Sequence, residues 1–379
     1  MTDETKAAPL AGLRIVEFAG IGPGPFAGMM LADMGAEIIR VDRPGAKVEQ
    51  PHLDFLARGR KSVTLDLKRP AGVEAALQLI ATSDGLIEGF RPGVMERLGL
   101  GPDPAMARNP ALVYGRMTGW GQNGALSHSA GHDLNYIAIT GALWSSGCAD
   151  RPPAFAMNLL GDFGGGGMFL AYGMLAALIR VGRTGVGDVV DAAICDGTAA
   201  LMAMTASRRA KGQWRDARQS NLLDGGVPWY GVYPCADGEW ITIAAVEPQF
   251  WAQVLELLAI PPEQAGDRND PATWPALRQT LSAIIRSQTR DHWIGLLGGT
   301  DACFAPVLSP AEAAIYPHNA ERQVFSSEGP LQPMPAPRFT QASTPLPNPA
   351  PVPGADTEAI LTSIGLDGTQ IEAAQGNAN

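Results

Sequence analysis

The sequence predicts an α/β fold, with a Rossmann-like large domain built on a mostly parallel sheet and a smaller α+β domain joined to it by long linkers. Short apolar runs alternate with helical patterns over the first half of the chain, as in a parallel sheet covered by helices. A β-hairpin pattern around Asp237-Gly238 then marks the change from this alternation to an antiparallel pattern. The length of 379 residues also exceeds what one hydrophobic core usually organises.

The large domain opens with a βαβ pattern. An apolar run at 13–18 precedes a helical pattern at 25–34 that begins with proline, and a second apolar run follows at 37–41. The same alternation continues along the chain. Further strands are expected at 62–67, 85–88, 111–117 and 188–192, and helices at 71–81, over the apolar stretch that ends near Arg180, and in the Ala- and Met-rich segment before Ala210.

The smaller domain begins with two alternating runs, 229–234 and 240–245, which flank the Asp-Gly turn and predict a hairpin. Helical patterns at 249–258 and 276–287 complete it. Four regions are therefore predicted. They are a large Rossmann-like domain at 1–192, a linker helix region at 193–228, the small domain at 229–308, and a return linker, Pro-rich strap and C-terminal helix at 309–379.

The strap between residues 330 and 353 contains nine prolines, which exclude a helix or a central strand. An extended chain must therefore run over a surface. The helix expected next, at 357–364, has an apolar face that needs a packing partner. The sequence favours a return to the large domain or an embrace of a partner subunit.

Composition narrows the function classes. With 28 basic and 38 acidic residues, the net charge is −10, so a nucleic-acid partner is not expected and a phosphate-bearing ligand needs a local cation cluster. The four cysteines form no CxxC pair. Of the five histidines, only His128 and His132 have the i, i+4 spacing of a metal site, and the Ser-Ala-Gly between them is a poor helix former. No metal is therefore expected.

Two segments bear on location. Residues 1–10 have the composition of neither a signal peptide nor a transit peptide, which favours the cytoplasm. The apolar run at 163–179 contains five glycines and is too short for a bilayer, so a buried helix and no membrane span are expected.

A glycine-rich turn after the first strand resembles a dinucleotide fingerprint. Gly22, Gly24 and Ala27 match its spacing, and Asp42 follows at the position of the ribose acid. Pro23 and Pro25, however, remove two of the N–H donors that such a loop offers to a pyrophosphate. A tight structural turn is the alternative that we favour.

Cations gather in the first hundred residues, several beside predicted strand ends. Each one alone could belong to a solvated rim, but together they favour a phosphate site. The cluster comprises Arg40, Arg43, Arg58, Arg60, Lys61, Arg91 and Arg97.

His132 and Asp162 are the candidate acid and base groups. His132 stands at a loop-to-helix junction before Asp133, which could cap the helix. Asp162 precedes the apolar helix and could be its N-cap, but four glycines follow at 164–167. Each costs roughly 0.5–1 kcal/mol in a helix, which suggests that backbone or ligand approaches closely. N–H groups at that helix start could also polarise a carbonyl oxygen.

These motifs together resemble the family III CoA-transferases. The stretches that carry the resemblance are 9–17, 32–37, 58–62, 90–93 and 161–162. Within the superfamily, Gly131–Tyr136 and Ala245–Phe250 resemble the α-methylacyl-CoA racemase branch, whereas the transferases generally lack the histidine.

The resemblance implies a cofactor-free, two-base racemisation of a 2-methylacyl-CoA thioester. His132 and Asp162 would act on opposite faces of the α-carbon, with Glu247 of the small domain supporting the histidine. It also implies an interlocked homodimer with the active site between unlike domains of two subunits. Further implied contacts are Tyr136, Asn158 and Tyr230 near the acyl group, Arg43, Arg91 and Arg97 on the CoA phosphates, and Leu65 and Leu67 near the adenine.

Three alternatives stay open. A family III CoA-transferase would use Asp162 as a nucleophile. A dinucleotide-dependent oxidoreductase would use the turn at 22–27, and a non-catalytic CoA-binding module would use neither. His132 and Glu247 favour the racemase, although Gly231-Val232 and Asp356-Thr357 depart from the family pattern, which has a polar residue and His-Thr there.

Overall fold

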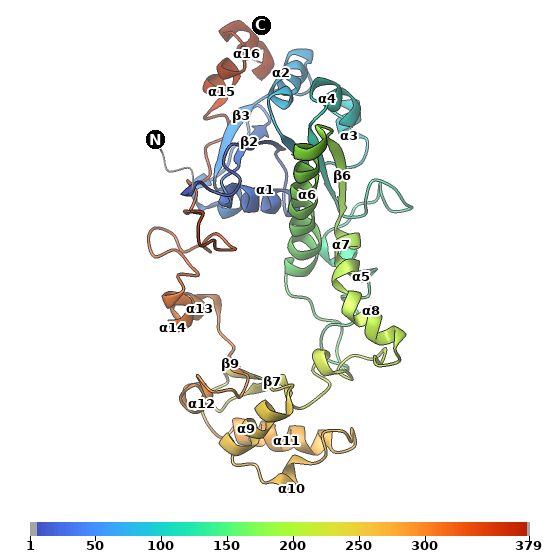
Figure 1. Ribbon diagram of the computed structural model, residues 1–379, viewed down its shortest axis with the longest axis vertical. Coiled ribbons are helices and arrows are strands. Elements are labelled where there is room, and N and C mark those ends of the chain that lie inside the picture. The colour runs from blue at the N-terminus through green and yellow to red at the C-terminus, as the bar shows by residue number, and fades with distance from the viewer. Residues whose placement is uncertain (1–5, 377–379) are drawn as a thin grey trace. The chain divides into compact units, whose positions relative to one another are not determined.

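The computed structural model describes residues 6–376, which form two compact units (Figure 1). The first unit runs to Leu143, resumes over Ala156–Ala203 and takes in the chain from Ser326 onward. The second comprises Trp144–Phe155 and Met204–Phe325. The prediction that residues 1–10 form no leader falls partly on residues 1–5, which lie outside the described residues.

A six-stranded sheet forms the centre of the first unit, and every neighbouring pair of strands is parallel. The strand order β3-β2-β1-β4-β5-β6 is that of a doubly wound dinucleotide-type fold, so the predicted α/β class is confirmed. The strands are β1 (Arg14–Phe18), β2 (Glu37–Asp42), β3 (Arg60–Thr64), β4 (Gly85–Glu88), β5 (Val113–Thr118) and β6 (Asp188–Ala193).

Helices cover both faces of this sheet, because alternate strand residues are apolar on each side. Val16, Ile39 and Val63 face one core with α2, α15 and α16, whereas Ile15 and Ile38 face α1 and α6. The helices of this unit are α1 (Pro23–Asp33), η2 (Pro51–Leu53), η3 (Phe55–Ala57), α2 (Pro70–Ala81), α3 (Val94–Arg97), α4 (Pro102–Arg108), α5 (Asp133–Ala138), η4 (Leu159–Gly167), α6 (Met168–Thr184), α7 (Ile194–Leu201), α15 (Thr357–Ser363) and α16 (Gly368–Gln375).

The predicted strand at 62–67 is shifted in the structure, where β3 ends at Thr64. Leu65 N–H still donates to Asp42 O of β2 at 3.0 Å, and the chain then turns away from the sheet, where Asp66 N–H donates to Ala374 O of α16 at 2.8 Å. Proline at the first position of α2 then starts the next helix. The two leucines predicted near adenine therefore lie in a strand-to-helix loop.

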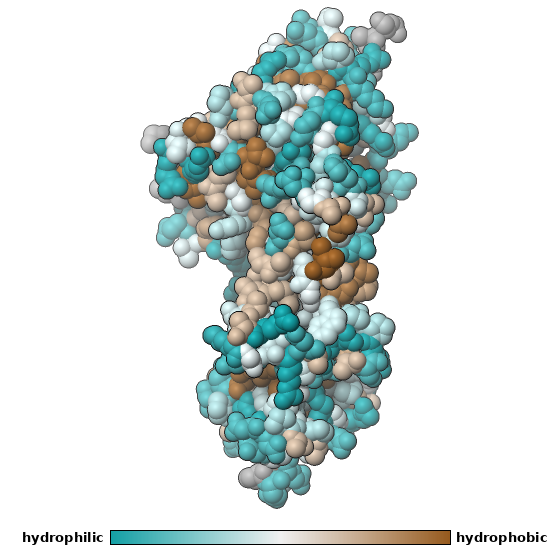
Figure 2. All heavy atoms as spheres, turned by 90° about the vertical axis from the view of Figure 1, so that its right-hand side faces the viewer, coloured by the Kyte–Doolittle hydropathy of each residue, from teal (hydrophilic) through white to brown (hydrophobic). Residues whose placement is uncertain are grey.

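The long apolar helix differs from the expectation of a fully buried helix. By length and composition alone, Leu159–Thr184 could cross a membrane, but only 39% of its most apolar window is buried. In this fold the segment packs on α1, β5 and β6, as a helix that covers a sheet does. Tyr172 and Ile179 nevertheless stay largely exposed. Figure 2 views the chain from the side of β6 and α7 and shows further apolar surface there.

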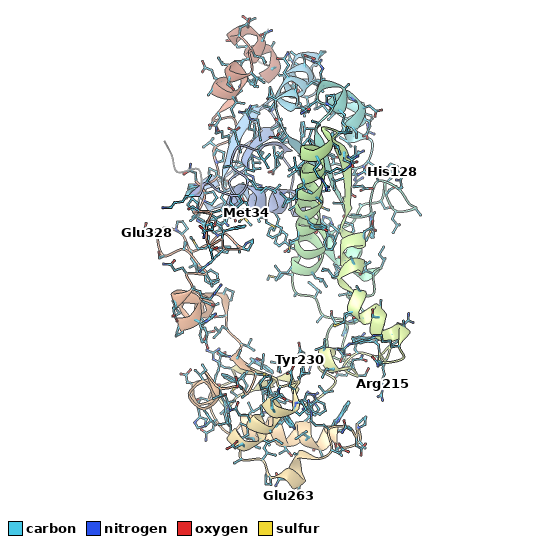
Figure 3. All side chains as sticks on the ribbon, in the orientation of Figure 1. Met34, His128, Arg215, Tyr230, Glu263 and Glu328 are labelled. Carbon is cyan, nitrogen blue, oxygen red and sulfur yellow. The ribbon has the colours of Figure 1, made fainter. Side chains whose placement is uncertain are left out.

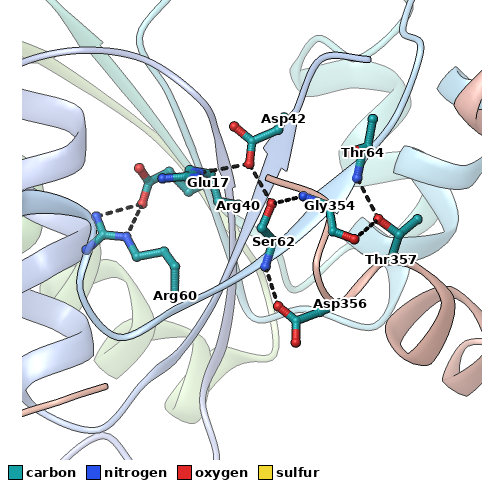
Figure 4. A network of polar contacts seen from close by, with 9 residues as sticks. All are labelled: Glu17, Arg40, Asp42, Arg60, Ser62, Thr64, Gly354, Asp356 and Thr357. Atoms are coloured by element: carbon teal, nitrogen blue, oxygen red, sulfur yellow. Dashed lines mark hydrogen bonds and ion pairs between the residues drawn. The ribbon is translucent and has the colours of Figure 1, made fainter. Parts of the chain in front are cut away.

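The chain that follows the Pro-rich strap is bound to the first unit by a polar network (Figure 4). Asp356 accepts from Ser62 N–H at 2.8 Å and returns its own N–H to Ser62 O at 2.9 Å. Thr357 Oγ1 accepts from Thr64 N–H at 3.0 Å. The Asp-Thr pair that departs from the family's His-Thr motif therefore fastens α15 to the edge strand β3.

The second unit is built on a three-stranded antiparallel sheet in the order β7-β8-β9. The predicted hairpin is present, with Tyr230 paired to Ala244, while β9 carried too short a pattern to be predicted. The elements here are β7 (Tyr230–Pro234), β8 (Trp240–Ala244), β9 (Phe304–Pro306), α8 (Ala203–Ala210, at the boundary), α9 (Pro248–Leu257), α10 (Pro262–Ala265), α11 (Trp274–Ile285), α12 (Arg290–Leu297), α13 (Pro310–Ile315) and α14 (Pro317–Glu321).

Candidate active site

A cavity of about 340 Å³ opens at the carboxyl ends of β1, β4 and β5. Ligands of doubly wound sheets bind at this edge, where the strand order reverses between β1 and β4. Four of the predicted site residues line this one cavity. They are Arg91, His132, Tyr136 and Asp162.

A second cavity of about 890 Å³ adjoins the first and shares Phe18, Gly20 and Ile21 with it. Arg43, Leu65, Leu67 and Lys68 line it, so a cation and two apolar side chains face the same space. Lys68 was missed from the sequence, because it stands outside the cation cluster and follows a strand pattern that suggested burial. The two cavities together offer an elongated site.

Asp162 lies within a π-helix, not at a helix cap. The N-cap of η4 is Asn158, and Phe163 N–H donates to Asn158 O five residues back at 3.2 Å. The expected N-cap role of Asp162 is therefore wrong. π-Helical segments are rare and are frequently found at functional sites, and here the segment places Asp162 in the cavity wall.

The glycines behind Asp162 admit neighbouring backbone rather than a ligand. A Cβ on Gly165 would meet Thr198 Oγ1 at 2.3 Å, and one on Gly197 would meet Gly165 O at 1.9 Å. A Cβ on Gly167 would meet Pro23 O at 2.7 Å. Of the two expected explanations, close approach of backbone is the correct one, since α7 and α1 press directly on η4.

The side chain of Asp133 fixes the backbone of Asp162 through a hydrogen bond. Its Oδ1 accepts from Asp162 N–H at 2.7 Å, and Gly161 makes room for this contact. The N-cap of α5 is His132, so the expected capping by Asp133 is wrong. The N–H groups of Asp162 and Phe163 are both taken within the protein, by Asp133 and Asn158. These two groups therefore cannot polarise a ligand carbonyl as expected.

The carboxyl of Asp162 sits in a partly desolvated position. Burial raises its pKa above the ordinary value, and the negative charge of Asp133 acts in the same direction. Asn158 Nδ2, which donates to Oδ2 at 3.2 Å, and nearby His132 both lower the pKa of Asp162. A carboxyl with a raised pKa beside an imidazole is a suitable pair for proton transfer near neutral pH.

His132 and Tyr136 present their side chains from the start of α5. His132 is exposed, and its N–H donates to Asn135 Oδ1 at 3.1 Å, which closes the first turn. Tyr136 donates its hydroxyl to Gly131 O and meets the Trp120 ring edge-on at 4.7 Å. Burial and the charge of Asp162 raise the pKa of Tyr136, so it stays a neutral hydroxyl.

Gly161→Ala is expected to lower both activity and stability. A Cβ there would stand 2.2 Å from Asp133 Oδ1 and 2.8 Å from Ile137 Cγ2, so Asp133 must release Asp162. We expect a loss of about 1–3 kcal/mol in the free energy of unfolding, measured by chemical denaturation. Gly182→Ala on α6 is the matched control, because nothing lies within 4 Å of its Cβ, and it should gain about 0.5–1 kcal/mol. Equal stability of the two variants would contradict this account.

Most of the predicted cation cluster belongs to the protein's own ion pairs, not to a phosphate site. Arg60 pairs with Glu17 and Arg58 with Asp33, all buried, and Arg40 pairs with Asp42. Lys61 pairs with Glu37 at the surface. A collective phosphate site is therefore wrong for these four cations. Arg43 and Arg91 line the cavities, whereas Arg97 on α3 is exposed and lines neither of them.

The acid of the dinucleotide alternative is engaged within the protein. Asp42 lines the larger cavity, but its Oδ2 accepts from Arg40 Nε at 2.9 Å and from Ser62 Oγ at 2.6 Å. The turn that carries Gly22 instead abuts the catalytic candidate, since a Cβ there would stand 3.3 Å from Asp162 Oδ2. The structure favours the tight-turn explanation.

Glu247 and Tyr230 belong to the second unit. Tyr230, which is labelled in Figure 3, begins β7. It lines a separate cavity of about 700 Å³ within that unit. Glu247 is exposed at the N-cap of α9. Asn158, by contrast, lies with the first-unit residues and touches Asp162 directly. Among residues 6–376, no group of three or more His, Cys, Asp or Glu side chains is arranged to hold a metal ion.

Comparison with known proteins places the chain. The sequence profile of CoA-transferase family III matches residues 10–357. The chain belongs to this family. Among family III relatives, α-methylacyl-CoA racemases from Mus musculus and Homo sapiens are 41% and 39% identical to it, each over 96% of this chain and 95% of their own length. A crystal structure of a CaiB/BaiF family protein from Brucella suis superposes with a TM-score of 0.81 at 26% identity, covering 95% of this chain and 100% of that one.

Proposed function

We propose that this family III member is a racemase that interconverts the (2R) and (2S) forms of 2-methylacyl-CoA thioesters. The observation that carries the proposal is the meeting of His132 and Asp162 at one cavity on the carboxyl edge of the sheet. Racemase relatives about 40% identical over almost the whole chain support it. No cofactor is needed in this proposal, since CoA is part of the substrate.

Each turnover moves one proton off and one proton onto the α-carbon. One side chain removes the α-proton, the C–H electron pair passes into the thioester as an enolate, and the other side chain protonates the opposite face. His132 would act as base for one enantiomer and Asp162 for the other. Burial raises the pKa of Asp162, which makes this carboxylate a stronger base for the proton transfer.

The enolate oxygen needs a donor other than the N–H groups of Asp162 and Phe163, which are occupied. The cavity wall at Gly131–Asp133 is the start of α5. In this first turn the His132 N–H already donates to Asn135 Oδ1 and the Asn135 N–H to His132 O, which leaves the N–H of the cavity-lining Asp133 as the donor of this wall. We therefore assign the stabilisation of the enolate to this wall, on the same element that presents His132.

CoA would occupy the larger cavity, with Arg43 on a phosphate and Leu65 and Leu67 beside the adenine. Arg91 would meet the ligand where the two cavities join. Arg97 stays part of this proposal as a contact from α3 to a phosphate beyond the cavities.

Neutralising the cavity cations is expected to weaken CoA binding. Arg43→Gln and Arg91→Gln each remove a charge that lines the site, so titration calorimetry with CoA should show a Kd raised about tenfold or more. Arg97→Gln should have a smaller effect. Lys61→Gln is the matched control, because Lys61 pairs with Glu37 at 2.6 Å, and it should leave Kd unchanged. A weakening by Lys61→Gln equal to that by Arg91→Gln would count against this placement.

A homodimer completes the proposal. The family resemblance pairs the large domain of one subunit with Glu247 and Tyr230 of the other subunit's small domain. The exposed apolar face of α6, with Met168, Tyr172 and Ile179 each more than half exposed, suits burial by a partner. Light scattering should give twice the 39.8 kDa of the chain. A monomer that racemises would contradict this part.

The CoA-transferase alternative uses the Asp162 carboxylate as a nucleophile. That reaction leaves a hydroxylamine-sensitive acyl-enzyme and moves CoA to a second acid. Incubation with an enantiopure 2-methylacyl-CoA and no second acid separates the two. Racemase activity converts it to a mixture of both enantiomers, seen by chiral chromatography. Retained configuration with a trapped acyl-enzyme would establish the transferase instead.

A further inference from the structure

The loop from Ala245 to Glu247 joins β8 to α9 and ends at the residue to which the proposed function gives a supporting role. Arg268 holds this loop from the side of the α10–α11 connection. Its Nη2 donates to Val246 O at 2.8 Å and to Ala245 O at 3.4 Å. Because these carbonyls precede Glu247 by one and two residues, the guanidinium fixes the backbone from which Glu247 projects.

Arg268 is itself held rigidly by aromatic side chains. Its guanidinium lies 4.2 Å from the centre of the buried Trp229 ring and 5.8 Å from that of Trp251. Trp274 Nε1 donates to Arg268 O at 3.0 Å and so fixes the backbone of the arginine as well. A guanidinium stacked on indoles loses little further freedom when it donates hydrogen bonds.

Burying the guanidinium of Arg268 costs desolvation free energy, which a side chain that only filled space would avoid. Burial lowers the pKa of Arg268 below its usual value, and the negative charge of Glu247 acts in the opposite direction. An apolar side chain could cover the tryptophans without this desolvation. The guanidinium, however, donates hydrogen bonds to the carbonyls of the loop, and it interacts electrostatically with the carboxylate of Glu247.

We propose that Arg268 is a positioning residue for Glu247 in the proposed racemisation. It acts through Glu247 and has no assigned contact with the substrate. The inference rests on the proposed function, in which Glu247 supports His132. If Arg268 acts only through Glu247, the loss of kcat on removing Arg268 is not added to the loss on removing Glu247.

The test compares Arg268→Met, Glu247→Gln and the double variant by racemisation kinetics of the full chain. Arg268→Met keeps apolar cover on Trp229 but removes the donors. Since a displacement of about 1 Å can cost roughly a hundredfold in rate, we expect kcat to fall about 10–100-fold with KM unchanged. The double variant should be no slower than Glu247→Gln alone. Arg268→Lys, which keeps the charge and one donor, should recover part of kcat and covers the case in which the methionine variant does not fold.

Arg218→Met is the matched control. Arg218 also donates to backbone carbonyls, including Cys148 O at 3.0 Å, and lies 5.9 Å from the centre of the Trp144 ring, but on another loop of the unit. It should keep the wild-type kcat. Losses that multiply in the double variant, or an unchanged kcat in Arg268→Met and Arg268→Lys, would overturn the inference, as would an unimpaired Glu247→Gln. A wild-type protein without racemisation would instead overturn the proposed function.

Discussion

Asp162→Asn is expected to lower racemisation by about a thousandfold or more while the fold is retained. The amide keeps the shape of the carboxyl and its contact with Asn158, but it cannot take up the α-proton. His132 still faces the cavity, so the enantiomer whose proton His132 removes should continue to exchange hydrogen with solvent without inverting. Proton NMR of each enantiomer in heavy water measures this exchange directly. Loss of exchange from both enantiomers would argue against independent bases.

The same variant should be more stable than the wild type at neutral pH. Burial raises the pKa of Asp162, so the folded state binds its proton more tightly than the unfolded state does. The stability that this provides is present below the unfolded pKa and is lost as pH rises through the folded pKa. Asparagine never ionises and avoids that loss. Thermal melts should therefore favour Asp162→Asn at pH 7, with the gain vanishing below about pH 4.

His132→Ala is the second substitution with a large expected effect. Removing the imidazole takes away one of the two proton-transfer groups, and racemisation should fall about 10²–10⁴-fold. The surviving exchange should concern the enantiomer opposite to the one that survives in Asp162→Asn. Because His132 is exposed and its N–H, not its ring, bonds Asn135, the melting temperature should change little. Gas chromatography of the released chiral acids after incubation in heavy water measures racemisation and, from the mass of each enantiomer, its exchange. A thermal melt measures the melting temperature.

The complementary pattern is the control for both variants. If the two variants retain exchange in the same enantiomer, His132 and Asp162 do not act on opposite faces. Tyr136→Phe serves as a matched substitution in the same cavity, since it removes the bond to Gly131 O but no proposed base, and should keep exchange in both enantiomers.

The sheet and hairpin could be predicted because each depends on local periodicity. Apolar strands such as 37–41 and the Asp237-Gly238 turn carry their own pattern. The π-helix could not, because it exists only where α7 and α1 press on Gly165 and Gly167, and those contacts come from distant parts of the chain. A run of glycines indicates that close packing is possible, but it does not indicate which element packs there.

The site shows the same division. His132 and Asp162 could be named from motifs, and they line one cavity. The phosphate role of Arg58 and Arg60 failed because a count of cations does not reveal buried acids such as Asp33 and Glu17, which lie on neighbouring elements. Lys68 was missed because its place at the larger cavity depends on the turn after β3, which the sequence pattern did not predict.

Solvent exchange by the unmodified protein tests two-base racemisation directly. A pure enantiomer of a 2-methylacyl-CoA, drawn from branched fatty acyl, bile-acid or 2-arylpropionyl chains, is incubated in heavy water and followed by mass spectrometry and chiral analysis. We expect one deuterium at the α-carbon of every inverted product molecule, without added metal or nucleotide. Inversion without deuterium, or no exchange with any chain of the panel while CoA binds, would contradict it.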